Sequence, residues 1–226
     1  MNIIFFKLAF RSILKNRLNS IINIVGFSLG IAACLFIFLF VKHETSFDTF
    51  YPNGDRLYRL VGTFNSKDNT DLSGFTWFPA APDIKKEIPG IDAYCRVTGE
   101  NTAKCFAGNH LFEIDKLRFA DENFFPFFHF KLITGNPETI LNSAEKIVLT
   151  GQTALKVFGS TDVIGKELMY QHQLFTISGI AANPPANTQF AFDALVSVKY
   201  IEQSNNFWKG WGGGITFLSY LQLAEN

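Results

Sequence analysis

An unbroken apolar stretch from Ile21 to Val41 dominates the hydrophobic pattern of this chain. It contains no charged residue, and Asn23 and Ser28 are its polar interruptions. At about 1.5 Å per residue, these 21 residues extend for about 31 Å and match a hydrocarbon core of about 30 Å. A soluble buried helix of this length would normally include a polar edge. The stretch therefore predicts a transmembrane helix.

The preceding residues 1–20 have a different pattern, that of an amphipathic helix too polar to cross a membrane. Apolar residues recur on one face at helical spacing, and basic residues follow a neighbouring face at i, i+4 and i+8. Such a helix lies in the membrane interface, either as a basic anchor or as a docking helix for a cytoplasmic partner. The residues expected to act at this interface are Phe6, Lys7, Phe10, Arg11, Leu14, Lys15 and Arg17.

Charge is distributed unequally on the two sides of the apolar stretch. The chain is neutral overall, but residues 1–41 carry four basic residues and no acidic one. Residues 42–226 therefore hold the other 16 basic and all 20 acidic residues. Since positive residues beside a span stay in the cytoplasm, we expect a cytoplasmic N-terminus and residues 42–226 outside. The sequence shows no basic patch away from the membrane, which argues against nucleic-acid binding.

Two kinds of cleavable signal are alternatives to a permanent span. A signal peptide has an apolar core of about 7 to 15 residues, whereas this apolar run continues through Phe40. The sequence IAAC at residues 31–34 resembles a lipoprotein processing site, with Cys34 as the lipidated residue. The following residues 35–41 are apolar where a polar tether would begin, so we interpret Cys34 as a small helix residue.

The rest of the chain has the mixed pattern of an α+β domain. Alternating apolar residues bounded by Gly, Pro and Asn predict short strands, and helical spacing with capping residues predicts three short helices. Five Phe between positions 124 and 130 form a dense apolar cluster that must be buried or engaged, and Asp121 before them is a good N-cap. The predicted strands are 57–64, 93–98, 102–107, 111–119, 146–150, 167–170, 174–181, 192–196 and 215–223, and the predicted helices are 76–88, 136–141 and 152–158.

The residues do not favour an enzyme. The four histidines are scattered and form no metal-binding spacing, and the glycine-rich segments lack the order of a phosphate-binding loop. Ser178-Gly179 follows Ile177 and so lacks the strained turn of a serine nucleophile. We therefore expect no catalytic, cofactor-binding or metal-binding residues in this chain.

Cys95 and Cys105 are the cysteines outside the predicted span. They fall in neighbouring predicted strands and would face each other across a turn centred near Glu100. Directly opposed residues in an antiparallel pair have Cα atoms about 4.5 to 5.5 Å apart, which suits a disulfide. We therefore predict a bridge between them, with two buried free thiols as the alternative, because a one-residue shift of register would forbid the bridge.

Several segments, taken in order, resemble one family of membrane proteins. The segments LAFRSILKNR, INIVGFSLGIA and HETSFDTFYPNGDRLYRL resemble the start of an ABC transporter permease of the MacB/FtsX type. Downstream, FADENFFPFFHFKLITGNPETIL, EKIVLTGQTALKVFG, VIGKEL, FTISGIAANPPANTQFAFDALVS and TFLSYLQL resemble the MacB-like periplasmic core domain. The resemblance covers essentially the whole chain, and the order of the segments is more specific than any one of them.

The resemblance implies a bacterial inner-membrane permease with a cytoplasmic helix (1–20), a transmembrane helix (21–41) and a two-lobed periplasmic domain (42–226). A porter-like lobe would comprise about 55–120 and 191–226, with an inserted lobe at about 121–190. ATP hydrolysis would belong to a separate or fused nucleotide-binding subunit. The expected partners are this ATPase, a second permease copy in a homodimer or pseudo-dimer, a periplasmic protein and the membrane.

The resemblance also implies that further permease helices follow this domain, so the chain resembles a fragment or a truncated reading frame. Its function would be to couple cytoplasmic ATP hydrolysis to export or to work in the periplasm. The alternative is a single-span, membrane-anchored periplasmic sensing or binding domain.

Overall fold

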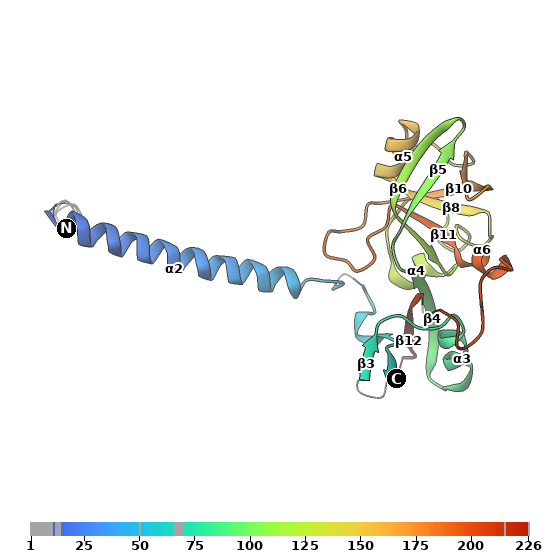
Figure 1. Ribbon diagram of the computed structural model, residues 1–226, viewed down its shortest axis with the longest axis horizontal. Coiled ribbons are helices and arrows are strands. Elements are labelled where there is room, and N and C mark those ends of the chain that lie inside the picture. Colours follow the sequence, from blue (N-terminus) through green and yellow to red (C-terminus); the bar gives the residue numbers. More distant parts are fainter. Residues whose placement is uncertain (1–10, 12–14, 50, 66–69, 215, 226) are drawn as a thin grey trace. The chain divides into compact units, whose positions relative to one another are not determined.

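The computed structural model describes residues 11, 15–49, 51–65, 70–214 and 216–225. The chain divides into two compact units, residues 1–47 and residues 48–226 (Figure 1). The first unit consists mainly of one long helix, and the second is a sheet-rich domain. The predicted combination of an N-terminal apolar helix and a mixed α/β domain is therefore confirmed.

The helix α2 runs from Arg17 to Glu44 and contains the whole apolar stretch. Its 28 residues extend for about 42 Å, so it is longer than the thickness of a hydrocarbon core. Among the described residues it is the one helix that is long and apolar enough to cross a membrane. Lys42 and His43 lie in its last turn, where positive charge is favourable to the helix dipole.

Ten strands among the described residues of the domain form one mixed sheet. The order is β1-β12-β4-β6-β11-β8-β10-β9-β5, and β7 pairs with β10. These strands are β1 (Leu57–Arg59), β4 (Ile91–Thr98), β5 (Asn101–Ala107), β6 (His110–Ala120), β7 (Leu132–Thr134), β8 (Lys146–Thr150), β9 (Glu167–Tyr170), β10 (Gln173–Ala181), β11 (Ala194–Ser197) and β12 (Phe217–Leu223).

The strand β6 pairs twice over its length and thereby closes a portion of the sheet on itself. Its first half is antiparallel to β5, and its last residues are parallel to β11. Since β5 also pairs with β9, the strands β6, β11, β8, β10, β9 and β5 form a ring. The end of β6 reaches β4 through the pair Val97 and Ala120, which joins the ring to β4, β12 and β1.

Short helices and one hairpin complete the domain. Along the chain, the α-helices of the domain alternate with strands. The helix α5 is capped by the Thr150 side chain at its start and by Gly159, with φ of 68°, at its end. The remaining elements are η1 (Gly54–Arg56), β2 (Gly62–Asn65), β3 (Thr70–Ser73), α3 (Ala80–Glu87), α4 (Phe124–Phe128), α5 (Gly151–Phe158) and α6 (Val198–Gln203).

The central strands bury both of their faces. On β8, Ile147 and Leu149 face one cluster, which we call the ring core and which also contains Cys105, Phe175 and Ile177. Val148 faces a second cluster that we call the phenylalanine core. This arrangement explains why these strands are continuously apolar rather than alternating. The phenylalanine core contains Phe124, Phe125, Phe127, Phe128, Phe130, Phe190 and Phe192, so the dense Phe cluster of the sequence is buried as expected.

Most predicted elements are present, but three of them differ in the described residues, and β3, β7, α4 and α6 are not among the predicted ranges. The strand predicted at 57–64 is divided between β1 and β2, which belong to different sheets. The predicted helix 76–88 begins only at Ala80, after Pro79. The segment 136–141 forms turns rather than a helix. The division into a porter-like lobe and an inserted lobe stays a prediction, although strands from both stretches share one sheet.

The predicted disulfide is wrong, because Cys95 and Cys105 are free and do not face each other. Cys95 on β4 pairs with Tyr220 of β12, while Cys105 on β5 pairs with Phe112 and Tyr170. The strands β4 and β5 do not form a hairpin, since each pairs with a different section of β6. The two thiols consequently lie in different cores.

We expect both thiols to resist alkylation in the folded chain. Burial raises the pKa of Cys105 to about 11 and also raises that of Cys95. Iodoacetamide at pH 8 should leave both unmodified until denaturant is added, and should then modify both without a reductant, as measured by mass spectrometry. Asn109→Cys, on an exposed turn, provides a reactive control. A 95–105 disulfide after denaturation would contradict the structure.

Candidate functional site

The structure leaves most of the predicted membrane-interface residues undescribed. Phe6, Lys7, Phe10 and Leu14 lie outside the described residues. Arg11 and Lys15 have helical backbone and exposed side chains, and the exposed Arg17 begins α2. The described cationic residues of the predicted interface are therefore accessible to anionic headgroups or to a partner.

The polar centre of the domain is Arg96, whose side chain is 4% exposed. On β4 its neighbours Cys95 and Val97 enter the phenylalanine core. Since side chains alternate along a strand, Arg96 points to the opposite face, where a charge needs a partner. In the sequence, the signal for such a partner is a single arginine within the predicted strand 93–98, from which we made no prediction.

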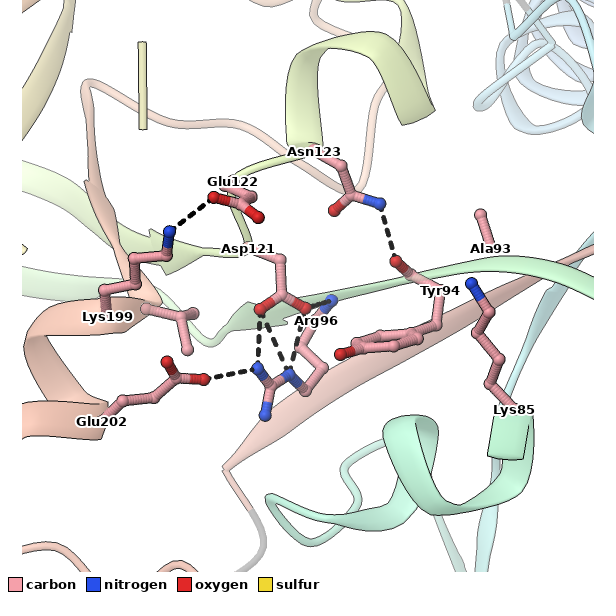
Figure 2. Close-up of a pocket in the computed structure, with 10 residues that line it drawn as sticks. Lys85, Ala93, Tyr94, Arg96, Asp121, Glu122, Asn123, Lys199 and Glu202 are labelled. Carbon is pink, nitrogen blue, oxygen red and sulfur yellow. Dashed lines mark hydrogen bonds and ion pairs between the residues drawn. The ribbon is translucent and has the colours of Figure 1, made fainter. Parts of the chain in front are cut away.

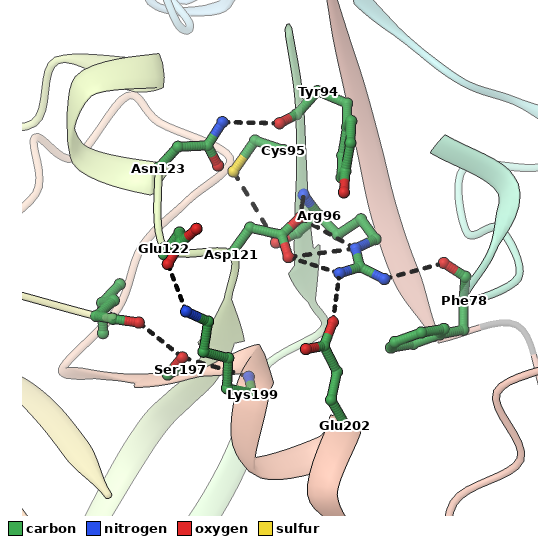
Figure 3. Close-up of polar contacts among 11 residues, drawn as sticks. Phe78, Tyr94, Cys95, Arg96, Asp121, Glu122, Asn123, Ser197, Lys199 and Glu202 are labelled. Carbon is green, nitrogen blue, oxygen red and sulfur yellow. Dashed lines mark hydrogen bonds and ion pairs between the residues drawn. The ribbon is translucent and has the colours of Figure 1, made fainter. Parts of the chain in front are cut away.

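Asp121, directly after β6, is that partner. Its Oδ1 accepts a hydrogen bond of 2.7 Å from Nη2 of Arg96, and its Oδ2 accepts bonds from Nε at 3.0 Å and from the Arg96 backbone N–H at 2.7 Å (Figure 3). The side chain of Asp121 is 12% exposed. The prediction that Asp121 caps a helix is therefore wrong, since Asn123 precedes α4 and the Asp121 carboxylate binds Arg96.

Two further groups complete the contacts of the guanidinium. Glu202 of α6 accepts a bond of 3.0 Å from Nη2, and the backbone carbonyl of Phe78 accepts one of 3.2 Å from Nη1. The Phe78 ring lies under the guanidinium, with 4.3 Å between Cζ and the ring centroid. Burial alone would lower the pKa of Arg96, but Asp121 and then Glu202 raise it above its ordinary value. Arg96 is therefore a permanent cation that holds α6 against β4.

A cavity of about 360 Å³ opens beside this ion pair (Figure 2). Its volume falls at the lower end of the range of small-molecule sites. Most of its charged groups pair with one another: Arg96 binds Asp121 and Glu202, and Lys199 of α6 donates a bond of 2.6 Å to Glu122. The lining residues are Lys85, Ala93, Tyr94, Arg96, Asp121, Glu122, Asn123, Val198, Lys199 and Glu202.

The chemistry of this cavity favours structural cross-linking over catalysis. Within the described ranges, no three His, Cys, Asp or Glu side chains come together as metal ligands would. Burial and then the charge of Asp121 raise the pKa of Tyr94, which keeps its hydroxyl protonated. The contacts instead tie β4, the end of β6 and α6 together.

Asp48 fastens the first residues of the domain to the loop before β11. It has a left-handed backbone, with φ of 55°, which Asp tolerates better than most residues. Its Oδ1 accepts hydrogen bonds from the hydroxyls of Thr188 at 2.7 Å and Tyr51 at 3.0 Å, and from the backbone of Gln189 at 3.2 Å. Its own N–H donates to the Asn187 carbonyl at 3.0 Å.

Comparison with known proteins points to one family. The family model for the MacB-like periplasmic core domain matches residues 20–222. A domain of a protein described as a permease from Porphyromonas gingivalis is 25% identical, with 78% of each chain covered and a TM-score of 0.65. A search of curated proteins found no match.

Two more distant structures share the fold alone. The periplasmic region of MacB from Actinobacillus actinomycetemcomitans is 13% identical, with 76% of this chain and 77% of that chain covered and a TM-score of 0.53. The extracellular domain of the noncanonic ABC-type transporter YknZ from Gram-positive bacteria is 12% identical, with 75% and 84% covered and a TM-score of 0.53.

We expect Asp121→Asn to destabilise the domain by about 3 to 5 kcal/mol, because it leaves Arg96 buried without its main counter-charge. Glu122→Gln is the matched control, since its pair with Lys199 is about half exposed and should contribute less than about 1 kcal/mol. Urea unfolding of the purified chain measures both. Equal losses from the two substitutions would show that the buried pair is not a special support of the fold.

Proposed function

Because the chain belongs to the family of MacB-like periplasmic core domains, we propose that it is the N-terminal portion of an ABC transporter permease. In this proposal its domain outside the membrane couples cytoplasmic ATP hydrolysis to export or to work in the periplasm. The family match and the helix α2 make the chain a MacB-like permease component, with a periplasmic core domain and an N-terminal helix apolar enough to cross a membrane.

The observation that carries the proposal is the continuity of the helix and the domain within one family match. The match begins inside α2 and ends inside β12, so the apolar helix and the sheet belong to the same unit of evolution. The contacts of Asp48 add a physical argument. A movement of the segment that follows α2 would act directly on the loop at Thr188 and Gln189.

The proposal places the N-terminus in the cytoplasm. The four basic residues before the span support this orientation through the excess of positive charge that cytoplasmic segments carry. The exposed Arg11 and Lys15 would then lie where a cytoplasmic subunit could contact them.

The proposed partners follow from the division of labour in a transporter. A permease periplasmic domain is not itself catalytic, so a separate or fused nucleotide-binding subunit would hydrolyse ATP. A second permease copy would complete a homodimer or pseudo-dimer. A protein in the periplasm would respond to the conformational change of the domain. No cofactor is proposed for this chain.

The test is co-purification and ATP hydrolysis by the complete permease that carries this chain. We expect a nucleotide-binding subunit to co-purify, and the double substitution Arg11→Glu and Lys15→Glu to reduce either its binding or the transport-linked component of its ATPase activity severalfold. The reason is that reversed charges would repel a surface that the basic side chains attract.

Lys85→Glu with Lys86→Glu on α3 is the matched control, because it reverses two charges in the domain outside the membrane. A periplasm-active reporter after residue 226 verifies insertion of every variant. Absence of any nucleotide-binding subunit would contradict the proposal and favour a sensing or binding domain. Unchanged ATPase activity in the Arg11→Glu, Lys15→Glu variant would show that residues 1–20 serve only as a membrane anchor.

A further inference from the structure

All three tryptophans of the chain belong to one surface region of the domain, and two of them are largely exposed. Trp208 is 67% exposed and Trp211 is 52% exposed, in the loop between α6 and β12. Trp77 is half-buried, and its ring centroid lies 5.6 Å from that of Trp211. Exposed tryptophan is costly in water, so two neighbouring indoles need an explanation.

Both exposed indoles are held in place. The Nε1–H of Trp211 donates a bond of 2.8 Å to Asp83 of α3, while its ring contacts Trp77. The Nε1–H of Trp208 donates to the Trp211 carbonyl at 3.4 Å. Phe207, which directly precedes Trp208 in the same loop, packs against the ring core and so anchors the loop. The polar ends of the indoles are thus bonded, and their apolar surfaces are left to solvent.

Glycines form the support on which Trp208 lies. A Cβ at position 213 would come within 2.2 Å of its Cδ1 atom, and one at position 210 within 3.1 Å of its Nε1 atom. The backbone therefore approaches the indole more closely than any other residue would permit. This cradle fixes Trp208 before any ligand arrives, which reduces the entropy cost of binding.

The polar side chains of this loop are mostly uncharged. Gln203, Asn205 and Asn206 are exposed, and the one charged residue between positions 203 and 214 is Lys209. The Lys209 ammonium donates to the carbonyl of Glu202. Rigid indoles beside adaptable amides and glycines suit a ligand that offers an apolar face and neutral hydrogen-bonding groups.

The size of the aromatic surface selects among such ligands. From a total of roughly 150 to 250 Å² for each tryptophan, the two exposed fractions give on the order of 200 to 300 Å². A stable protein interface needs about 800 Å² from each partner. The two indoles alone supply about a third of that area, which matches one or two sugar rings, whose C–H faces stack on indoles and whose hydroxyls bond to amides.

We propose that the loop 203–214 is a binding site for a neutral glycan. Pyranose rings of the glycan stack on the exposed surfaces of both Trp208 and Trp211, and the amide side chains of the loop bind their hydroxyls. Asp83 and the glycine cradle act as positioning groups that keep the two indoles in their binding orientation. This site is independent of the transport function proposed above.

The test measures binding of maltohexaose, cellohexaose and chitohexaose to the chain in phospholipid nanodiscs free of glycosidic detergent. Tryptophan fluorescence and calorimetry should show saturable binding of at least one of these neutral probes. Trp208→Ala and Trp211→Ala should each weaken it at least about tenfold, because each removes a stacking surface. Phe106→Ala, an exposed aromatic on β5, is the matched control and should leave the dissociation constant unchanged.

A second variant separates binding from folding. Gly213→Ala keeps both indoles but displaces Trp208 from its cradle, so it should weaken glycan binding while the thermal unfolding of the domain changes little. The proposal is overturned if no neutral probe binds, if binding survives both tryptophan substitutions, or if only an acidic glycan binds. It is equally overturned if the tryptophans bind a periplasmic protein and none of the glycans.

Discussion

The double pairing of β6 is the constraint on which the rest of the domain depends. Its first half completes the ring with β5, and its last four residues pair with β11, while Ala120 also reaches β4. One strand thus carries the hydrogen bonds that close the ring core and those that join β4, β12 and β1 to it. Loss of this strand's register would move its apolar side chains to the wrong face and separate both cores at once.

Buried charge secures the place where β6 changes partners. Arg118 is buried on β6 and donates to the carbonyls of Thr98 and Ala191, at 2.9 Å each, and to the carboxylate of Glu100 at 2.8 Å. Burial lowers the pKa of Arg118, and Glu100 opposes this effect. Three residues later Asp121 binds Arg96. These arginines satisfy carbonyl and carboxylate groups that irregular pairing would leave without partners, so the junction is specified by polar contacts as well as by packing.

Local features of the structure could be predicted from the sequence, and long-range ones could not. The helix α2 and most strands follow from runs and alternations of apolar residues, which act within a few positions. The contact between Arg96 and Asp121 joins positions 25 apart, and Asp121 also fits the local pattern of a helix cap. The disulfide prediction failed for the same reason, because it assumed that Cys95 and Cys105 pair as sequence neighbours while β6 separates their strands.

The central claim is that β6 unites the ring with the strands β1, β12 and β4 in a single cooperative unit, and the two buried thiols can test it directly. Cys105 reports on the ring core and Cys95 on the phenylalanine core. Pulsed alkylation at increasing urea, followed by mass spectrometry, measures when each thiol becomes accessible. The structure predicts the same transition midpoint for both. Exposure of one thiol at a clearly lower urea concentration than the other would show that the two cores unfold separately and would contradict the claim.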